Sequence, residues 1–567
     1  MALTPRLFAR APGPERPQLP GPWFWTLLGA LVLCKLALTS DFAVLIQLAP
    51  HDDGLYVARA YHLLAGEAFG PYDARLLTKL PGISLWLAAS RTLGIPYLLS
   101  IDLLYFAAGA YFLHGLWRCG FGSGTLLGVA ALYLFNPVTL TEDWIRVIRD
   151  PLAACLLVVL LAAMLHALLV AQTRRIGWPH VLLIAAVTAF ALLLREEDFL
   201  LYGLLLLFAL ALLRQLRAAG APLRGRVAAA AMVAAILPFA CGYGANLVAR
   251  EYVQAHYGVA LIHDFGDGEF PALIAAMRSL ESRKDNRFVM ITQEALGRLR
   301  TEVPRLAPVI ERLPRPGAGT YSCQRYGVCS EWANGWMLFW IKDAAFEAGL
   351  TPDARSAQEF FRLARIDIER ACAEGRLQCR DKGRGVLPPF ELRWTRAYLQ
   401  EWSALVGMWL APRPAILQEI KTRFEVDSVL ARMFQIVTMT HQADTRLQAP
   451  AATPLAQPVI DTGLREWRAA IGAAYPVLGG AVELAAAAAL VYLYRRRRGP
   501  LHGPFVATAV LFGLYTGLRL CALAYAAVYM GYYDPRMIFS SYVATLLICP
   551  ALIAEAYTLR LAARRAQ

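Results

Sequence analysis

The chain has 567 residues, of which 57% are hydrophobic and 17% are charged, and its mean hydropathy is +0.44. A composition this apolar excludes an ordinary soluble enzyme and indicates a polytopic membrane protein. The formal net charge is +14, but no soluble segment carries a basic stripe alternating with aromatic residues, so we expect no nucleic-acid partner. We assign the positive charge to membrane topology and to contact with anionic lipid.

About ten apolar runs are long enough, or nearly long enough, to cross about 30 Å of hydrocarbon. They lie near residues 23–48, 97–117, 123–141, 151–171, 179–194, 198–213, 227–249, 471–494, 503–530 and 537–559. The fold class predicted from them is all-α, with a bundle of about ten transmembrane helices and a mostly helical external domain.

Arginine clusters orient these runs, because short cytoplasmic loops carry an excess of Lys and Arg. With ten spans every cluster falls on one side of the membrane; the clusters include Arg6, Arg10, Arg16, Arg118, Arg174, Arg175, Arg214, Arg217, Arg224, Arg226, Arg495 to Arg498, Arg560, Arg564 and Arg565. Both termini are then cytoplasmic. We expect a multi-pass protein of a bacterial inner membrane, with its largest loop in the periplasm.

Four regions follow from this topology. We expect a proline-rich cytoplasmic leader at 1–22, an N-terminal transmembrane module at 23–250, a helical periplasmic domain at 251–470 and C-terminal spans with a cytoplasmic tail at 471–567. The first apolar run is too long for the apolar region of a signal peptide, and no small-residue cleavage motif cleanly ends it, so we expect it to remain as an anchor.

The cysteines divide between the spans and the large loop. Cys323, Cys329, Cys372 and Cys379 lie in the loop and form two close pairs. In an oxidising compartment this pattern favours two local disulfides, Cys323 to Cys329 and Cys372 to Cys379, over free thiols. A zinc site is less favoured, because the spacings are wide and no histidine lies near.

Two adjacent carboxylates, Asp52 and Asp53, follow the first apolar run directly. Two acids at the end of a membrane helix are costly to desolvate, which favours a functional site over residues without a role. The segment after them, from Tyr56 to Leu64, has helical spacing and predicts a short amphipathic helix along the membrane surface. Gly66 to Pro71 should break that helix, and Lys79 with Pro81 should turn the chain toward the next span. The first external loop is expected at 49–96.

The pattern of this loop resembles the first external loop of GT-C glycosyltransferases of the protein O-mannosyltransferase and aminoarabinose-transferase type (family 39). That family carries an acidic pair after its first helix, then a tyrosine, a small residue, a glycine and a Lys-Pro-Pro-like turn. The matching residues here are Asp52, Asp53, Tyr56, Ala60, Leu64, Gly66, Pro71, Lys79 and Pro81. Leu80 replaces the first proline of the turn, and Asp53 stands where glutamate is common.

Further residues extend the resemblance. The family has another acidic residue in its second external loop, here 141–150, where Glu142, Asp143 and Asp150 are available, with Arg146 and Arg149 close by. Asp150 is the favoured candidate, because it opens the next span as Asp-Pro-Leu. The family also tends to carry a basic residue at the outer start of a late helix, which corresponds here to Arg536 after Tyr533 and Asp534.

The resemblance implies inverting transfer of a sugar from a polyprenyl-phosphate donor to an acceptor glycan, lipid or protein. Asp52 would be the general base. Lys79, Arg149 and Arg536 would stabilise the departing phosphate, since guanidinium groups bind phosphate oxygens in pairs. Asp53 and Asp150 are candidate ligands for a divalent cation, Mg or Mn, as in some relatives. Tyr56, Glu142 and Arg146 are further site candidates.

Simpler interpretations remain open beside these. Asp150 suits a helix N-terminus, Arg536 suits an interfacial anchor, and Arg195 to Glu197 is expected to be a self-paired surface cluster. The stripe Trp332, Trp336 and Trp340 favours packing onto the membrane domain over a platform for a sugar. Two other functions also remain: a glycolipid transporter or flippase, which should carry charged residues deep within its spans, and a non-catalytic scaffold of envelope polysaccharide assembly.

Overall fold

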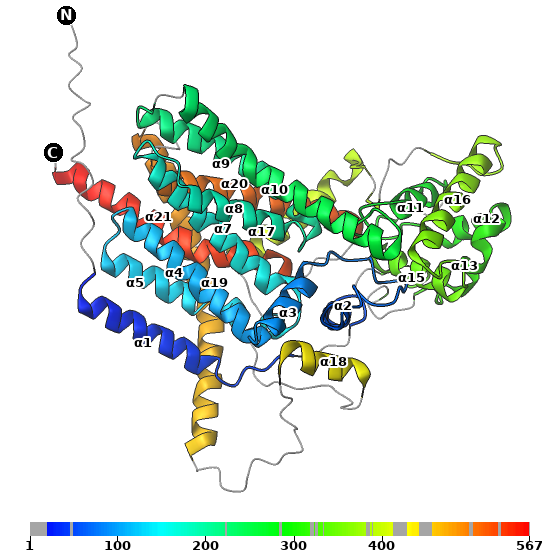
Figure 1. Cartoon of the computed structure of the whole chain (residues 1–567), viewed down its shortest axis with the longest axis horizontal. Coiled ribbons are helices and arrows are strands. Elements are labelled where there is room, and N and C mark those ends of the chain that lie inside the picture. Colours follow the sequence, from blue (N-terminus) through cyan, green and yellow to red (C-terminus); the bar gives the residue numbers. More distant parts are fainter. Residues whose placement is uncertain are drawn as a thin grey trace, which may run out of the picture.

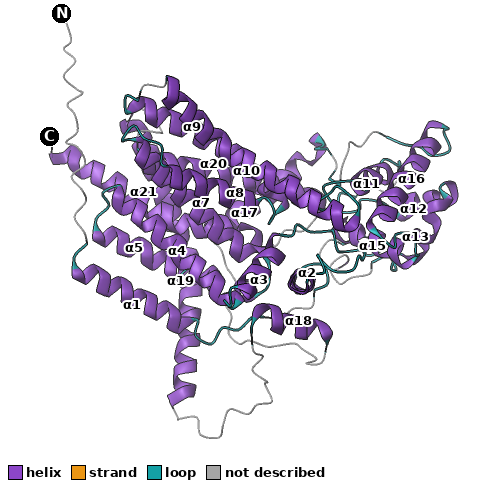
Figure 2. Cartoon of the chain, viewed as in Figure 1, coloured by secondary structure: helices purple, strands orange, loops and turns teal. Residues whose placement is uncertain are grey.

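The computed structural model is built from helices, and no strand occurs in the described part of the chain (Figure 2). It describes residues 20–45, 49–221, 224–282, 286–317, 323, 327–332, 334–380, 386–387, 389–411, 428–440, 456–497, 503–530 and 535–565. The all-α fold class predicted from the sequence is confirmed.

Every apolar run predicted from the sequence contains a helix. Eight helical segments within the described ranges are long and apolar enough to cross a membrane. They are α4 (Tyr97–Arg118), α5 (Ser123–Leu134) with η1 (Pro137–Leu140), α7 (Arg149–Ala171), α9 (Leu201–Ala218), α10 (Gly225–Tyr257), α19 (Ala456–Arg497), α20 (Pro504–Met530) and α21 (Phe539–Arg565), the last preceded by η5 (Pro535–Ile538). The other two runs form the shorter helices α1 (Pro22–Leu38) and α8 (Trp178–Ala191).

Helix α7 is the centre of the membrane bundle (Figure 1). It packs against α4, α8, α20 and α21, and nearly all of its residues from Asp150 to Leu168 are buried. A helix that is apolar on every side has to be surrounded by other helices. The absence of amphipathic patterning in this run therefore places it in the core. Its first turn, with Arg149 and Asp150, lies at one end of the bundle.

Helix α1 ends at Leu38, earlier than the apolar run predicts. The guanidinium of Arg468 on α19 is buried and donates to the carbonyl oxygen of Leu38 at 2.9 Å and 2.7 Å. It thereby satisfies an acceptor that the end of a helix leaves open. The chain then runs in extended form, and the amide of Leu45 donates to the carbonyl oxygen of Ile145 at 3.0 Å.

The loop after α1 contains the short helix that the sequence predicted and a second one that it did not predict. Helix α2 (Asp53–Ala65) ends at Gly66, which has a φ of 78°, and α3 (Gly82–Thr92) follows a turn-rich segment. The amide of Gly82 donates to the carbonyl oxygen of Leu193 at 2.7 Å. A Cβ atom at position 82 would lie 2.6 Å from that oxygen, so only glycine allows the first loop to meet the 193–196 segment this closely.

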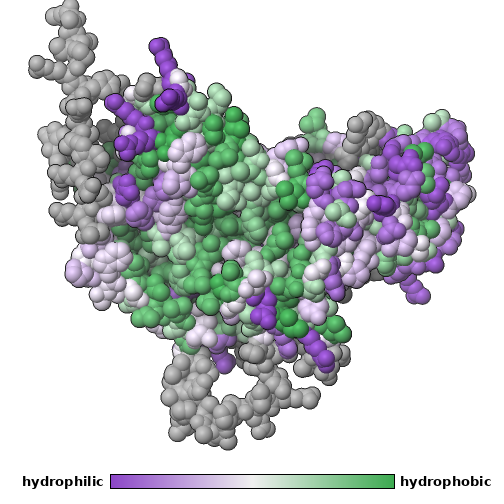
Figure 3. Space-filling model, viewed as in Figure 1, coloured by the Kyte–Doolittle hydropathy of each residue, from purple (hydrophilic) through white to green (hydrophobic). Residues whose placement is uncertain are grey.

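A second hydrophobic core lies outside the bundle. Its helices are α11 (Phe270–Arg278), α12 (Gln293–Glu302), α13 (Ala307–Arg312), α15 (Asn334–Glu347) and α16 (Ala354–Ala373). We call residues 258–394 the inserted domain. It projects from the bundle in Figure 1, and Figure 3 shows that its surface is mostly hydrophilic whereas the bundle is mostly hydrophobic.

The edges of the inserted domain differ from the expected range of 251–470. Helix α10 continues through the first boundary to Tyr257, and α19 begins at Ala456, before the second. Between them, α17 (Thr395–Leu410) packs against α20, and α18 (Val429–Thr438) packs against α2. Leu405 of α17 and Phe434 and Val437 of α18 are buried in the hydrophobic core of the bundle, so these two helices belong to it by packing although their sequence composition is ordinary.

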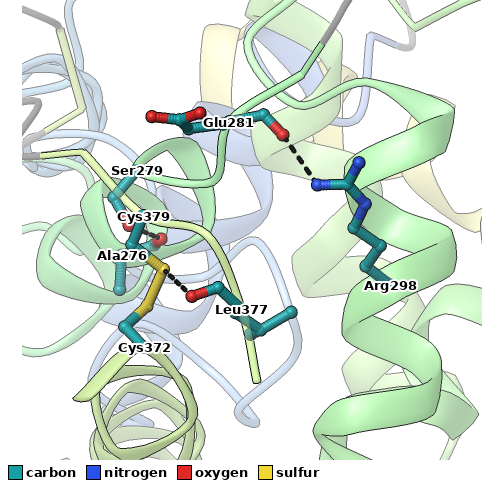
Figure 4. The surroundings of a disulfide bond; sticks show 7 residues. All are labelled: Ala276, Ser279, Glu281, Arg298, Cys372, Leu377 and Cys379. Carbon is teal, nitrogen blue, oxygen red and sulfur yellow. Dashed lines mark hydrogen bonds between the residues drawn. A yellow bond between two sulfur atoms is a disulfide. The ribbon is translucent and has the colours of Figure 1, made fainter. Parts of the chain in front are cut away.

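Both predicted disulfides are present, Cys323 to Cys329 and Cys372 to Cys379. The second joins the end of α16 to a segment that pairs with residues 279–281 (Figure 4). The amide of Glu281 donates to the carbonyl oxygen of Gln378 at 2.9 Å, and the amide of Arg380 donates to that of Ser279 at 2.7 Å. The disulfide therefore ties this pair of loop segments to the end of α16 at one edge of the inserted domain.

We predict that replacing Cys372 and Cys379 together by serine destabilises the inserted domain by ~2 kcal/mol, because the cross-link closes a short loop and restricts the unfolded chain. Thermal unfolding of the purified protein in detergent, compared with and without the replacement, measures this change. Cys241→Ser, at a free cysteine of α10, is the control and should leave the unfolding temperature unaltered. An equal change in both variants would contradict the prediction.

Candidate active site

Asp52 lies between two cations that come from opposite ends of the chain. It occupies the position before the first turn of α2, and its side chain is 15% exposed. One carboxylate oxygen is 3.9 Å from Nζ of Lys79, and the other accepts a hydrogen bond from Nη2 of Arg536 at 3.3 Å. The fold thus joins three residues that the sequence singled out, separated by as many as 484 positions.

The charges around Asp52 hold it firmly ionised. Burial alone would raise its pKa, but Lys79, Arg536, Arg149 and His51 outweigh burial and lower the pKa to about 2. Lys79 and Arg536 each contact Asp52 through one nitrogen, whereas Arg146 holds Asp53 through two. The contacts of Asp52 are also longer than those of Asp53 with Nη2 of Arg146 and of Asp150 with Arg195.

Arg59 fixes the segment that carries Lys79, a role that the sequence interpretation missed. Its guanidinium is buried, donates to the carbonyl oxygen of Leu76, and donates to that of Lys79 at 3.0 Å. It also lies 5.6 Å from the ring centre of Phe69. The available signal was helical spacing, because residues 52, 56 and 59 follow one another at four and three positions and share a face of α2.

Asp53 is held by Arg146 in a paired interaction. Its two carboxylate oxygens accept from Nε of Arg146 at 3.2 Å and from Nη2 at 2.7 Å. The carboxylate is fully buried, and burial raises its pKa to about 6 despite the opposing effect of Arg146. Arg146 also contacts Asp143 at 3.2 Å. The pair connects the first and second outer loops, because Asp53 begins α2 and Arg146 precedes α7.

Asp150 and Arg149, at the start of α7, each pair with a residue of the loop after α8. Asp150 accepts a hydrogen bond from Arg195 at 2.7 Å, and both side chains are buried. Arg149 pairs with Glu196. The expectation that Arg195 and Glu196 form a self-paired surface cluster is therefore wrong. The side chain of Glu197 lies outside the described residues.

Glu196 interacts with two of the cations that also act on Asp52. Burial alone would raise its pKa, but Arg149, Lys79 and His263 lower it to about 2. Lys79 and Arg149 thus act on both carboxylates. The sequence offered only a charged cluster between two apolar runs, which does not reveal that the loop folds over the start of α7.

The remaining candidates have different surroundings. Tyr56 is fully buried on α2, and its hydroxyl has no hydrogen-bond partner within the described part of the chain. Burial raises its pKa, and Arg149, Asp52 and Glu196 are the nearest charges. Glu142 is exposed in the second outer loop. Tyr533 and Asp534, named with Arg536, lie outside the described residues.

The carboxylates proposed for a divalent cation already have guanidinium partners, Asp53 with Arg146 and Asp150 with Arg195. Across the described ranges, no group of three His, Cys, Asp or Glu side chains is arranged to hold a metal. A cation at either position would have to displace an arginine. We therefore assign no step to a metal, and metal dependence stays a prediction.

The tryptophans expected to form one helical stripe, in and just before α15, lie in different environments. Trp332 is buried in the core of the inserted domain and donates from its indole nitrogen to the carbonyl oxygen of Pro314 at 2.8 Å. Trp336 lies edge-on to His51, with 5.0 Å between ring centres. The inserted domain thereby covers the residue next to Asp52.

A small apolar cavity lies in the bundle among helices whose ends carry the ion pairs. Its volume is about 20 Å³, roughly the room that one water molecule needs. It is lined by Ala153, Leu156, Leu157, Leu160, Val187, Ala191, Leu201, Tyr515, Arg519 and Ser540. Ala153 is one helical turn after Arg149 and Asp150, Leu201 follows the 196–200 turn, and Ser540 is four residues after Arg536. Residues that line this cavity are thus neighbours in the sequence of the ion-paired residues.

These features define an integral, multi-pass membrane protein with a desolvated cluster of ion pairs where its outer loops meet. No family model and no curated protein sequence matches the chain. Two solved structures are similar, both of ArnT from Cupriavidus metallidurans, one bound to undecaprenyl phosphate and one in the apo state. Each is 13% identical, and each alignment covers 90% of this chain and 78% of the ArnT chain, with TM-scores of 0.29 and 0.28. The proposals below therefore rest on the geometry of the site.

We predict that activity falls as pH decreases through about 6, because protonated Asp53 cannot accept both hydrogen bonds from Arg146. The raised pKa of Asp53 means that the folded state binds this proton more tightly than the unfolded state. Its contribution to stability is therefore present at low pH and lost as pH rises through the folded-state pKa.

The measurement is the pH profile of activity beside the unfolding temperature over the same range. Activity should fall on acidification with an apparent pKa near that of Asp53, and Asp53→Asn should remove this step from whatever activity remains. Loss of folded protein in parallel with activity would assign the decline to unfolding and contradict the prediction.

Proposed function

We propose that this protein is a membrane glycosyltransferase that moves a sugar from a polyprenyl-phosphate donor to an acceptor at its outer face. The observation that carries the proposal is Asp52, which is buried between Lys79 and Arg536 where the outer loops meet the helix bundle. The ArnT structure with undecaprenyl phosphate names a donor lipid of the same class for comparison.

The donor would bind with its phosphate at the cations and its lipid in the bundle. Lys79 and Arg536 offer positive charge outside the spans, and Arg149 acts on the same place. The helices that begin beside these cations are apolar, which suits isoprenoid units nearest the phosphate. A lipid with an anionic head and an apolar tail satisfies both parts of the site at once.

Transfer would proceed with inversion at the sugar. The acceptor hydroxyl attacks the anomeric carbon, the bond from that carbon to the phosphate oxygen breaks, and polyprenyl phosphate leaves with the bonding electrons. The hydroxyl proton goes to Asp52. Lys79 and Arg536 neutralise the charge that develops on the leaving phosphate.

The low pKa of Asp52 fits this sequence of events. A carboxylate with a pKa of about 2 is a weak base, because its negative charge is stabilised by the nearby cations. When a donor phosphate shares Lys79 and Arg536, that stabilisation decreases and the pKa of Asp52 rises toward the range in which it accepts a proton more readily. Donor binding would thus activate the base.

We predict that Asp52→Asn lowers kcat by roughly 10²–10⁴-fold, as loss of a general base does. The KM for the donor should stay constant or fall, because the amide no longer competes with phosphate for Lys79 and Arg536. The assay is release of polyprenyl phosphate from a polyprenyl-phosphate sugar by protein reconstituted in lipid. Glu67→Gln, at an exposed residue of the same loop, is the control and should behave as the unaltered protein; equal rates in both variants would exclude Asp52 as the base.

Substitution of the cations should instead weaken binding of the donor phosphate. Lys79→Ala and Arg536→Ala are each predicted to weaken binding of undecaprenyl phosphate by about tenfold or more, the effect of losing one hydrogen bond between charged groups. Binding by the full-length protein in detergent is measured by native mass spectrometry. Arg91→Ala, at the end of α3, is the control, and unaltered binding in both site variants would separate these residues from the donor phosphate.

A glycolipid transporter is the second candidate, and buried charged residues within the helices favour it. Lys35 on α1, Glu483 on α19 and Arg519 on α20 are buried, although the sequence interpretation found the middle of the spans nearly all apolar. The two carboxyl oxygens of Glu483 have no hydrogen-bond partner within the described residues. Movement of a labelled polyprenyl-phosphate sugar across sealed vesicles without release of polyprenyl phosphate would support the transporter over the transferase.

A further inference from the structure

We propose that α17 (Thr395–Leu410) is an interfacial membrane helix, with one side against the acyl chains of the bilayer and another side in water. The sequence interpretation placed these residues in a periplasmic helical domain. Packing against α20 shows only that the helix belongs to the bundle. The proposal concerns what covers the rest of its surface, and it does not depend on the transferase function of the Asp52 site.

The beginning of α17 lies against the last part of α20 (Figure 1). Just before α17, the amide of Glu391 donates to the hydroxyl of Tyr529 at 3.1 Å. One turn into α17, the hydroxyl of Tyr398 donates to the carbonyl oxygen of Cys521 at 3.4 Å. The contacts of α17 with α20 therefore move inward from the end of α20 as the chain advances.

The deeper of these contacts lies within the hydrocarbon of the bilayer. The 27 residues of α20 extend about 40 Å, whereas the hydrocarbon is about 30 Å thick. If α20 crosses the bilayer, at most about 10 Å of it can extend beyond the hydrocarbon at this end. Cys521 precedes the last residue, Met530, by about 14 Å of helix. The hydroxyl of Tyr398 thus reaches α20 below the surface of the hydrocarbon.

The side of α20 that α17 contacts continues into a surface that faces lipid. Leu514 and Leu518 are 48% and 50% exposed. They share a face of α20 with Cys521, because the three positions follow one another at spacings of four and three residues. Large apolar side chains that are exposed on a spanning helix contact acyl chains. This continuity places α17 at the border between the bundle and the lipid.

The exposed surface of the chain changes character just before α17. Among the described residues between 258 and 380, no large apolar side chain is exposed, as suits a surface in water. Phe390, Leu392, Leu399 and Trp402 are then exposed within a short stretch, Leu392 by 85% and Leu399 by 55%. Clustered apolar exposure marks contact with a membrane or a partner, and tryptophan is enriched at the boundary between membrane and water.

The residues of α17 divide among three sides. Leu405 is buried in the bundle. Leu399 and Trp402, three positions apart, form an exposed apolar side. Exposed polar residues recur at spacings of four and three positions on another side; they are Arg396, Gln400 and Ser403. A helix wholly in lipid would not carry this polar side, and an interfacial helix requires both.

The position of α17 also bears on Arg536. Helix α17 packs against η5, the short helix that carries Arg536. An interfacial α17 therefore holds this segment near the level of the lipid headgroups.

The test is photolabelling of the full-length protein in nanodiscs of palmitoyl-oleoyl phosphatidylcholine that contain a phosphatidylcholine with a diazirine on one acyl chain. Mass spectrometry locates the labelled residues. We expect label on Leu399 and Trp402 of α17, as on Leu514 and Leu518 of α20. Helix α16 of the inserted domain should carry none. Asp52→Asn should be labelled like the unaltered protein, since lipid contact does not depend on the transferase function.

A matched pair of variants tests the two exposed sides of α17. Leu399→Glu and Gln400→Glu place the same carboxylate at adjacent exposed positions. A carboxylate is costly to place in lipid, so Leu399→Glu should lose the label on α17 and lower the unfolding temperature in nanodiscs. Gln400→Glu, on the polar side, should retain both. On a helix in water the two substitutions would have similarly small effects.

Absence of label from α17 while α20 is labelled would overturn the proposal. Equal label on α16 and α17, or identical behaviour of the two variants, would overturn it as well. Label that appears on α17 only after dilution to one chain per nanodisc would assign the apolar side to a second copy of this chain, against the proposal. If Leu399→Glu fails to fold, labelling of the unaltered protein and of Gln400→Glu still decides the outcome.

Discussion

The burial of charged groups at the meeting point of the outer loops is the constraint on which the rest of this structure depends. A carboxylate removed from water is stable only when a cation and hydrogen bonds replace the water. Asp53 obtains them from Arg146, Asp150 from Arg195 and Glu196 from Arg149. Each pair connects two segments that are far apart in the sequence, so satisfying these charges also determines how the loops are arranged over α7.

Asp52 differs from Asp53 because two cations contact it, each through one atom. Lys79 and Arg536 contact it singly, at 3.9 Å and 3.3 Å, whereas Asp53 is held by two hydrogen bonds from one guanidinium. A paired guanidinium is a structural connection that is costly to break. Cations that contact a carboxylate singly can be redistributed to an incoming phosphate, which is why we place the chemistry at Asp52 and the architectural role at Asp53.

The inserted domain packs against the site. Trp336 covers His51 beside Asp52, and Arg75 in the first loop pairs with Asp343 of α15 at 2.6 Å. The domain is therefore joined to the loop that carries the proposed base.

The motif around residues 52–81 could be recognised from the sequence because its signals are local. An acidic pair after an apolar run, helical spacing and a closing glycine predict a short helix with a charged start, and α2 begins at Asp53 and ends before Gly66. Arg59 and Glu196 were missed because their roles depend on partners in other segments. The division of the pair between Asp52 and Asp53 also had no local signal, since it depends on which cation reaches which carboxylate.

The sequence by itself determined the all-α membrane fold, the positions of its apolar helices and both disulfides, because hydrophobic runs and cysteine spacing act over short stretches of chain. Only the tertiary structure decided that Arg536 reaches Asp52, that Arg195 and Glu196 fold onto the start of α7, and that α17 and α18 join the bundle. Those outcomes depend on long-range packing and on pairing of buried charges, which are properties of the folded chain as a whole.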